Sequence, residues 1–117
     1  MSPSVLIVDD HAGFRTSARR LLEADGYVVV GEAADAAGAL EASPTLAPDL
    51  VLLDVALPDL DGFEVARRLT AAGDGPDVIL TSTRDWSEVG ALVTGCGARG
   101  FVSKDDLSGA ALAALSR

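Results

Sequence analysis

The sequence predicts an α/β fold, in which an open parallel sheet of five strands is covered by five helices on its two faces. Short apolar runs of strand length alternate along the chain with longer segments in which apolar residues recur at helical spacing. Such alternation is typical of a parallel sheet with right-handed crossovers. A closed barrel needs about eight of these units, so we expect the sheet to be open.

Three strands and two helices are predicted in the first half of the chain. The strands are the apolar runs 5–8, 28–30 and 50–53. Between the first two, helical spacing relates Phe14, Ala18, Leu21 and Leu22, and Gly26 is well placed to end this helix. The second helix is short and weakly apolar, and we expect Ser43-Pro44 to end it.

The second half of the chain continues the same alternation. Asp61 is a plausible N-cap for a helix that runs to about Ala72. Strands follow at 78–80 and 101–102, separated by a helix that Ser87 can cap. The apolar residues of that helix are Val89, Leu92, Val93 and Cys96, and the last helix contains Leu107, Ala111, Ala114 and Leu115.

Length and composition indicate one globular domain, residues 1–117, with a strongly acidic surface. The formal charge is −9, from 18 acidic and 9 basic residues. Such a surface repels nucleic acids and favours a bound cation or a partner with a basic face. No apolar run approaches the ~20 residues of a membrane span, and no signal sequence is recognisable, so we expect a cytoplasmic protein without membrane contact. The single cysteine, Cys96, fits a reducing compartment and a small buried position.

Polar side chains follow four of the predicted strands at the point where each strand ends. They are Asp9 and Asp10, then Asp54, then Thr81, Ser82 and Thr83, and finally Lys104. The carboxyl ends of parallel strands lie at one edge of a sheet, where open α/β sheets bind their ligands. An isolated Asp54 would more often only end its strand, but the other polar strand ends favour a chemical role for it.

The expected cluster of carboxylates indicates a cation site. Three carboxylates in one place repel one another and raise each other's pKa, so a divalent cation is expected between them. Oxygen ligands favour Mg²⁺, or Mn²⁺ in its place, and we expect His11 to lie at the surface where the first helix starts, not to act as a ligand. An ionised Asp54 beside such a cation, with a lysine and a hydroxyl opposite, has the groups needed for phosphoryl transfer.

Four short stretches, each a weak signal alone, occur together at a specific spacing. They are Val8-Asp9-Asp10-His11, Leu52-Leu53-Asp54 followed by Pro58 and Asp61-Gly62, Thr81-Ser82-Thr83, and the run 97–104 that ends in Ser103-Lys104. Together they resemble the receiver domain of two-component response regulators, over essentially the whole chain. The resemblance implies a flavodoxin-like sheet of strand order 2-1-3-4-5. It also implies a phosphoryl group accepted from the phosphohistidine of a sensor kinase or phosphotransfer protein. No enzyme activity is implied beyond this self-catalysed transfer and autodephosphorylation.

The same resemblance implies a role for each site residue. Asp54 would be the phosphoacceptor. Asp10 would be a direct ligand of Mg²⁺, Asp9 would act chiefly through water, and Asp54 and the backbone carbonyl of Ala56 would complete the site. Lys104 would pair with the phosphoryl oxygens and the backbone N–H of Thr83 would help to hold them. Ser82, with Thr81 as the alternative, would be the switch hydroxyl, and Phe101 the aromatic switch residue.

The resemblance also suggests an output. After phosphorylation, Ser82 and Phe101 would change the face formed by the helix at Ser87, the strand 101–102 and the last helix, which is also the expected homodimer face. Asp10-His11 and Lys104-Asp105 look most like receivers that precede a helix-turn-helix DNA-binding domain. We therefore expect either a receiver cut from such a regulator or a stand-alone regulator. One departure is Asp105, where many family members carry Pro.

Two other functions deserve comparison with this one. A phosphatase or phosphotransferase of the haloacid-dehalogenase type also uses an Asp after a buried strand, with Mg²⁺. It needs a second Asp two residues later, where this chain has Ala56, and the chain is too short for a cap domain. The other alternative is a receiver-like binding module that has lost phosphorylation, against which the presence of every polar site residue argues.

Overall fold

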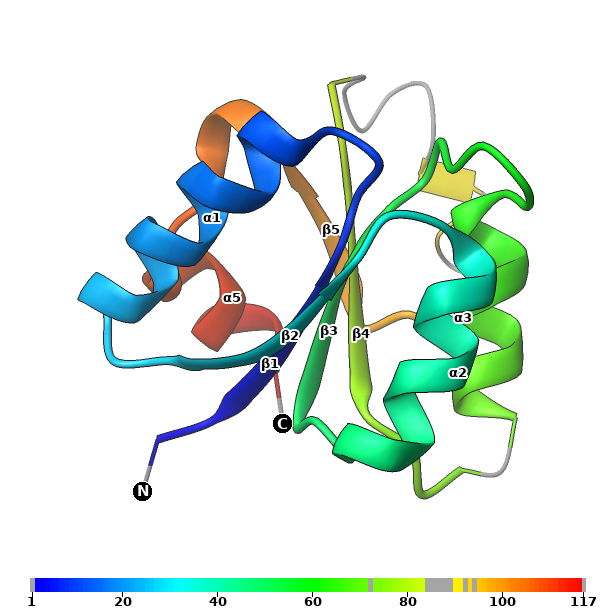
Figure 1. The fold of residues 1–117 in the computed structure, drawn as a ribbon. Helices are drawn as coiled ribbons and strands as arrows, with labels where there is room; N and C mark the ends of the chain where they lie inside the picture. The colour runs from blue at the N-terminus through cyan, green and yellow to red at the C-terminus, as the bar shows by residue number, and fades with distance from the viewer. Residues whose placement is uncertain (1, 72, 84–89, 92, 94, 117) are drawn as a thin grey trace.

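One sheet of five parallel strands runs through the molecule, in the order β2-β1-β3-β4-β5 (Figure 1). The computed structural model describes residues 2–71, 73–83, 90, 91, 93 and 95–116. The strands are β1 (Ser4–Val8), β2 (Val28–Ala33), β3 (Leu50–Asp54), β4 (Asp77–Ser82) and β5 (Gly100–Ser103). The predicted α/β class and strand order are confirmed.

Helices cover both faces of this sheet. The helices α1 (Ala12–Ala24) and α5 (Gly109–Leu115) lie on one face, and α2 (Ala36–Leu46) and α3 (Gly62–Thr70) lie on the other (Figure 1). A short 3₁₀ turn, η1 (Lys104–Asp106), follows β5. These are four α-helices within the described residues. Most of the helix predicted after Ser87 lies outside the described residues, although residues 90, 91 and 93 are helical.

The sheet separates two hydrophobic cores. Because side chains alternate along a strand, Leu53 and Leu80 face the core under α2 and α3, whereas Leu52 and Ile79 face the core under α1 and α5. Every residue of β3 is buried. A central strand buried on both faces is what the uninterrupted apolar run predicts. Cys96 is also buried, as predicted, and donates its thiol to the Val93 carbonyl at 3.2 Å.

The predicted end of α2 at Ser43-Pro44 is wrong, because the helix continues to Leu46. Its buried residues, Ala36, Ala39 and Ser43, form a stripe that reaches the proline. Pro44 lies in the last turn, where it removes a single backbone donor and where its fixed φ is already helical. The helix ends instead at Ala47, whose φ of 47° is left-handed.

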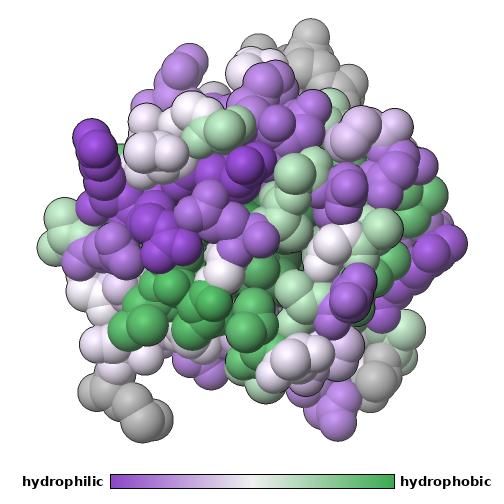
Figure 2. Space-filling model, in the orientation of Figure 1, coloured by the Kyte–Doolittle hydropathy of each residue, from purple (hydrophilic) through white to green (hydrophobic). Residues whose placement is uncertain are grey.

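The edge strand β2 carries the most exposed of the large apolar residues in the described part of the sheet. Val28 is 50% exposed, and Figure 2 shows hydrophobic side chains gathered along this strand. On the same outer strand, Glu32 is exposed and lies opposite Ile7 in the β1–β2 register.

None of the described helices is long and apolar enough to cross a lipid bilayer.

Candidate functional site

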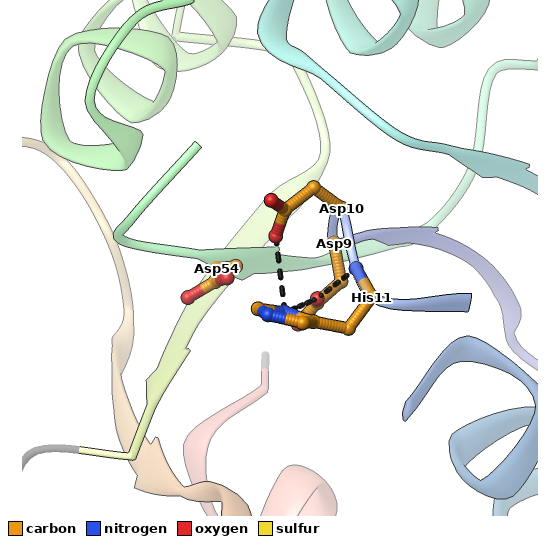
Figure 3. A group of neighbouring side chains, drawn as sticks. All are labelled: Asp9, Asp10, His11 and Asp54. Atoms are coloured by element: carbon orange, nitrogen blue, oxygen red, sulfur yellow. Dashed lines mark hydrogen bonds and ion pairs between the residues drawn. The ribbon is translucent and has the colours of Figure 1, made fainter. Parts of the chain in front are cut away.

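Three carboxylates and one imidazole meet at the carboxyl edge of the sheet. Asp9 and Asp10 follow β1 directly and Asp54 is the last residue of β3. One potential ligand atom from each of Asp9, Asp10, His11 and Asp54 lies within 4.8 Å of the others, and Figure 3 shows these groups around a common space. The structure thus brings together the acids that the sequence placed at separate strand ends.

Asp9 is the innermost of the three acids. It is completely buried, and its N–H donates to the Ala33 carbonyl of β2 at 3.0 Å. The Oδ1 atom accepts a hydrogen bond from the His11 N–H at 2.8 Å. The Oδ2 atom lies 2.7 Å from Lys104 Nζ, an ion pair whose angles fall outside hydrogen-bond geometry. Asp9 is therefore held both through its backbone N–H and through the two oxygens of its carboxylate.

Asp10 is more exposed, and its carboxylate contacts the neighbouring imidazole. His11 Nδ1 lies 3.0 Å from Asp10 Oδ1 and 3.0 Å from Asp9 Oδ1 (Figure 3). His11 is also the N-cap of α1 and its side chain is 69% exposed. Its predicted place at the surface, where the first helix starts, is confirmed. Its contact with both acids was not predicted, because spacing along the chain does not say which way the ring turns.

Asp54 is only 3% exposed. Its Oδ1 atom accepts a hydrogen bond from the Ala56 N–H at 3.3 Å, and its Oδ2 atom lies 3.6 Å from Lys104 Nζ. Burial raises the pKa of the Asp54 carboxyl, the negative charge of Asp9 raises it further, and the Ala56 N–H and Lys104 oppose that rise. The negative charge of this site is incompletely compensated by protein groups.

Lys104, the only lysine of the chain, supplies the ammonium of this cluster. It is the first residue of η1, directly after β5, and its side chain is 12% exposed. Its Nζ atom lies 4.5 Å from the centre of the Phe14 ring, on the side of the sheet covered by α1. The sequence indicated only that Phe14 belongs to the apolar face of its helix, so its contact with the site was missed.

Thr81 and Ser82 are the last two residues of β4, and their side chains point to opposite faces of the sheet. In the β3–β4 register Thr81 is opposite Asp54, and in the β4–β5 register Ser82 is opposite Ser103. By alternation, Thr81 shares the α1 and α5 face with Asp54, whereas Ser82 shares the other face with Phe101, which packs against the core under α2 and α3. The hydroxyl of Thr81 is buried, with no hydrogen-bond partner among the described residues. Thr83, the next residue, is exposed.

The loop after Asp54 is fixed at two points. The Gly62 N–H donates to the Val55 carbonyl at 2.9 Å, and a Cβ at Gly62 would lie 2.7 Å from Val55 Cα and would collide with the Asp54 carbonyl oxygen. Only glycine fits this close approach. The Asp59 carboxylate accepts hydrogen bonds from the N–H groups of Ala36 (2.8 Å) and Ala37 (3.0 Å), which lowers the pKa of Asp59 and ties the loop to α2.

The donor set fits a small divalent cation. Its oxygens come from three carboxylates, each with an atom within 4.8 Å of the others, and a single lysine lies beside two of them. Mg²⁺ and Mn²⁺ take oxygen ligands of this kind and keep several waters, which the exposed Asp10 side leaves room for. The raised pKa of the Asp54 carboxyl also means that an added positive charge would stabilise its ionised form.

A doubly wound sheet with acids, hydroxyls and an ammonium at its carboxyl edge defines a flavodoxin-like domain, a class of proteins that bind their ligands at the strand ends. Residues 5–115 match the model of the response regulator receiver domain family. The chain belongs to this family, whose members are phosphorylation-dependent parts of two-component systems and generally act as signalling modules.

Similar proteins agree with this assignment. The chain is 40% identical over 111 residues to a Pseudomonas aeruginosa protein named as a transcriptional regulator, covering 94% of this chain and 54% of that one. It is 35% identical over 107 residues to the transcriptional regulatory protein YdfI of Bacillus subtilis, covering 89% and 49%. The chain therefore spans about half the length of these curated relatives.

Solved receiver structures share the fold. The signal receiver domain of the response regulator NarL from Mycobacterium tuberculosis superposes with a TM-score of 0.86 at 34% identity, covering 97% of this chain and 96% of that one. A LuxR-family two-component response regulator from Aurantimonas superposes with a TM-score of 0.87 at 31% identity, covering 98% and 86%.

Proposed function

We propose that Asp54 is the phosphoacceptor of this receiver and that residues 1–117 act as one phosphorylation-controlled domain. The observation that carries the proposal is the position of the Asp54 carboxylate. It is buried at the end of the central strand, beside two further acids and 3.6 Å from the only lysine. A carboxylate needs no separate base to act as a nucleophile, because its ionised form attacks directly.

The neighbouring groups would share the charge of the reaction. Asp10 would bind Mg²⁺ or Mn²⁺ directly, Asp9 would do so through water, and Asp54 with the Ala56 carbonyl would complete the protein ligands. The bound cation would offset negative charge on the phosphoryl oxygens. Lys104 would pair with one of those oxygens, and the Thr83 N–H would donate to another.

The transfer itself needs the Asp54 oxygen, the phosphorus and the leaving imidazole nitrogen to lie in line. A carboxylate oxygen of Asp54 attacks the phosphorus of a phosphohistidine in line, the new O–P bond forms, and the P–N bond breaks. The leaving imidazole keeps the bonding electrons and takes up a proton from solvent. The product is an acyl phosphate on Asp54, and its later hydrolysis by water restores the carboxylate. We propose no enzyme activity for the chain beyond these two steps.

The proposed switch connects this site to a surface. Ser82 would hydrogen bond to the phosphoryl group and Phe101 would turn inward, with Thr81 as the alternative hydroxyl. The shared sheet face of Ser82 and Phe101 supports Ser82, whereas the register of Thr81 with Asp54 supports Thr81. Phosphorylation would shift the equilibrium between two conformations of the face formed by β5, α5 and the segment after Ser87.

The expected partners follow from the family. A sensor histidine kinase or a phosphotransfer protein would supply the phosphoryl group, and a second copy of the chain would bind at the switching face. Relatives named as transcriptional regulators favour control of transcription as the output. We propose the cytoplasm as the compartment, with which the free, buried thiol of Cys96 is consistent.

The direct test is phosphorylation by acetyl phosphate in the presence of Mg²⁺, followed by intact mass spectrometry. The wild-type chain should gain one phosphoryl group, and Asp54→Asn should gain none. Asp105→Asn is the matched control, because Asp105 is an exposed acid next to Lys104 and should leave labelling unchanged. Undiminished labelling of Asp54→Asn would overturn the assignment. A wild-type chain that is never labelled would leave a phosphorylation-independent binding module.

A further inference from the structure

Arg15, in the first turn of α1, contacts the backbone of the site. Its Nη1 atom donates a hydrogen bond to the Asp9 carbonyl oxygen at 2.6 Å, and its Nε atom donates to Glu32 Oε1 at 3.0 Å. The side chain is only 18% exposed. Among the described residues, these contacts of Arg15 go to a backbone carbonyl and to Glu32, and not to the carboxylates of the site or to Lys104.

The carbonyl that Arg15 holds belongs to the peptide that joins the two acids. This peptide is a rigid plane that contains the Asp9 C=O and the Asp10 N–H. The Asp9 N–H is already fixed by Ala33 on β2, so the bond from Arg15 fixes the next plane along the chain. The orientation of that plane and the φ angle of Asp10 together set the direction in which the Asp10 side chain leaves the backbone, and Arg15 fixes the first of these two.

Glu32 on β2 anchors the guanidinium in turn. Its carboxylate accepts from Arg15 Nε at 3.0 Å and from Arg19 Nε at 2.8 Å. These contacts lower the pKa of Glu32, so its carboxylate stays ionised at neutral pH. Because Arg15 and Arg19 share this one carboxylate, Glu32 offsets only part of their charge, and a test of the geometric role of Arg15 has to keep a positive charge at position 15.

We infer that Arg15 is a positioning residue for the divalent cation, because it orients the Asp9–Asp10 peptide from which the proposed metal ligands project. The inference rests on the proposed function and adds to it a residue outside the ligand set. Groups that orient metal ligands affect affinity strongly although they do not touch the metal. Arginine suits this role because its planar fork donates to two fixed acceptors at once, which the single ammonium of a lysine does less well.

The chain offers a matched control in Arg19. Arg19 lies one turn later on α1 and pairs with the same Glu32 carboxylate, but it does not contact the Asp9 carbonyl in the structure. Arg15→Lys and Arg19→Lys both keep the positive charge and both weaken the pairing between α1 and β2. Only the first of them removes the bond to the Asp9–Asp10 peptide.

The test is Mn²⁺ binding, measured as loss of the free-ion signal in electron paramagnetic resonance. The dissociation constant should rise about 10-fold in Arg15→Lys, at the lower end of the range for groups that orient metal ligands. It should stay within about twofold of wild type in Arg19→Lys, where no such group is lost. Glu32→Gln, which frees the guanidinium of Arg15, should move the constant in the same direction by a smaller factor. Arg15→Gln serves as the second variant if Arg15→Lys does not fold, as judged by circular dichroism.

A second measurement separates positioning from damage to the fold. Labelling of Arg15→Lys by acetyl phosphate should be slow at low Mn²⁺ and should return to the wild-type rate at saturating Mn²⁺. Equal Mn²⁺ affinity in Arg15→Lys and wild type, or a labelling defect that saturation does not repair, would overturn the inference. A wild-type chain that binds no Mn²⁺ would instead overturn the proposed cation site.

Discussion

Lys104 Nζ lies closer to Asp9 than to Asp54, at 2.7 Å against 3.6 Å. The ammonium therefore pairs closely with Asp9 and lies farther from the Asp54 carboxylate. The carboxylates of Asp9 and Asp54 would attract both a divalent cation and Lys104, and the two positive charges would repel each other. In the proposed function, Lys104 would therefore both pair with phosphoryl oxygens and compete with the cation for the carboxylates.

This shared charge predicts opposite effects in one variant. Lys104→Met should bind Mn²⁺ more tightly than wild type, because the competing ammonium is gone. Its labelling by acetyl phosphate should fall at least tenfold, because the ammonium that would pair with a phosphoryl oxygen is gone and the divalent cation alone does not replace it. Mn²⁺ titration and labelling rates, measured on the same preparation, check both effects. Weaker Mn²⁺ binding in Lys104→Met would contradict the shared-charge account.

Phe14 should act on phosphorylation through Lys104. A ring 4.5 Å from an ammonium contributes roughly 0.5–2 kcal/mol, with the larger values at desolvated positions. Phe14→Leu keeps an apolar side chain and removes the aromatic face, and we expect labelling to slow severalfold. Phe14→Tyr keeps the face and should retain most of the rate. If both variants were labelled at the same rate, the ring would serve only to fill space.

Asp54→Asn should make the protein more stable at neutral pH. The pKa of the Asp54 carboxyl is raised in the folded state, so folding disfavours its ionised form. Stability therefore falls as pH rises from the ordinary Asp pKa to the folded value, and the cost is fully present above that. The variant removes this cost, while Lys104 keeps Asp9 as a partner. Thermal melts should show a gain at pH 7 that disappears below about pH 4, where the carboxyl of an unfolded chain is protonated.

The exposed Asp59 provides a comparison of opposite sign. Hydrogen bonds from Ala36 and Ala37 lower its pKa, so its contribution to stability is present above the ordinary Asp pKa and is lost as pH falls through the lowered value. Asp59→Asn should therefore melt earlier than wild type at pH 7. Melts that shift in the same direction for Asp54→Asn and Asp59→Asn would contradict the assigned environments.

Gly62→Ala should destabilise the protein by about 1–3 kcal/mol, the usual cost of inserting an atom where no space exists. The added Cβ would collide with the backbone at Asp54 and Val55 and displace the end of β3. Gly13→Ala is the control, because the space around Gly13 in α1 is open and alanine favours a helix. Urea unfolding should show a loss for Gly62→Ala and a small gain for Gly13→Ala. An unchanged unfolding midpoint in Gly62→Ala would mean that the backbone at Asp54 and Val55 moves to accommodate the methyl group at little cost, and would contradict this prediction.

The fold and the clustering of the acids could be predicted from the sequence. Both follow from the hydrophobic pattern of each segment and from the rule that parallel strands end at one edge of a sheet. The apolar run at β3 predicts a strand buried on both faces, and the carboxyl edge of a parallel sheet then brings Asp9 and Asp54 together. Phosphoacceptor and ligand roles remain predictions, because positions alone do not define chemistry.

What could not be predicted depends on contacts between distant residues. Arg15 and Glu32 are 17 positions apart, and the pairing of their side chains depends on how α1 crosses the outer strand. Asp59 caps α2 from a loop that follows it in sequence, which no pattern near residues 36–37 reveals. The continuation of α2 through Pro44 likewise depends on burial against the sheet, which outweighs the local signal.

Because Lys104 is the only lysine, its amine can report on the site without interference from another side chain. Reductive methylation with ¹³C-formaldehyde would place one pair of labelled methyl groups at this ε-nitrogen, apart from those at the amino terminus. A single NMR resonance would then follow cation binding and phosphorylation in real time, under the ring current of Phe14.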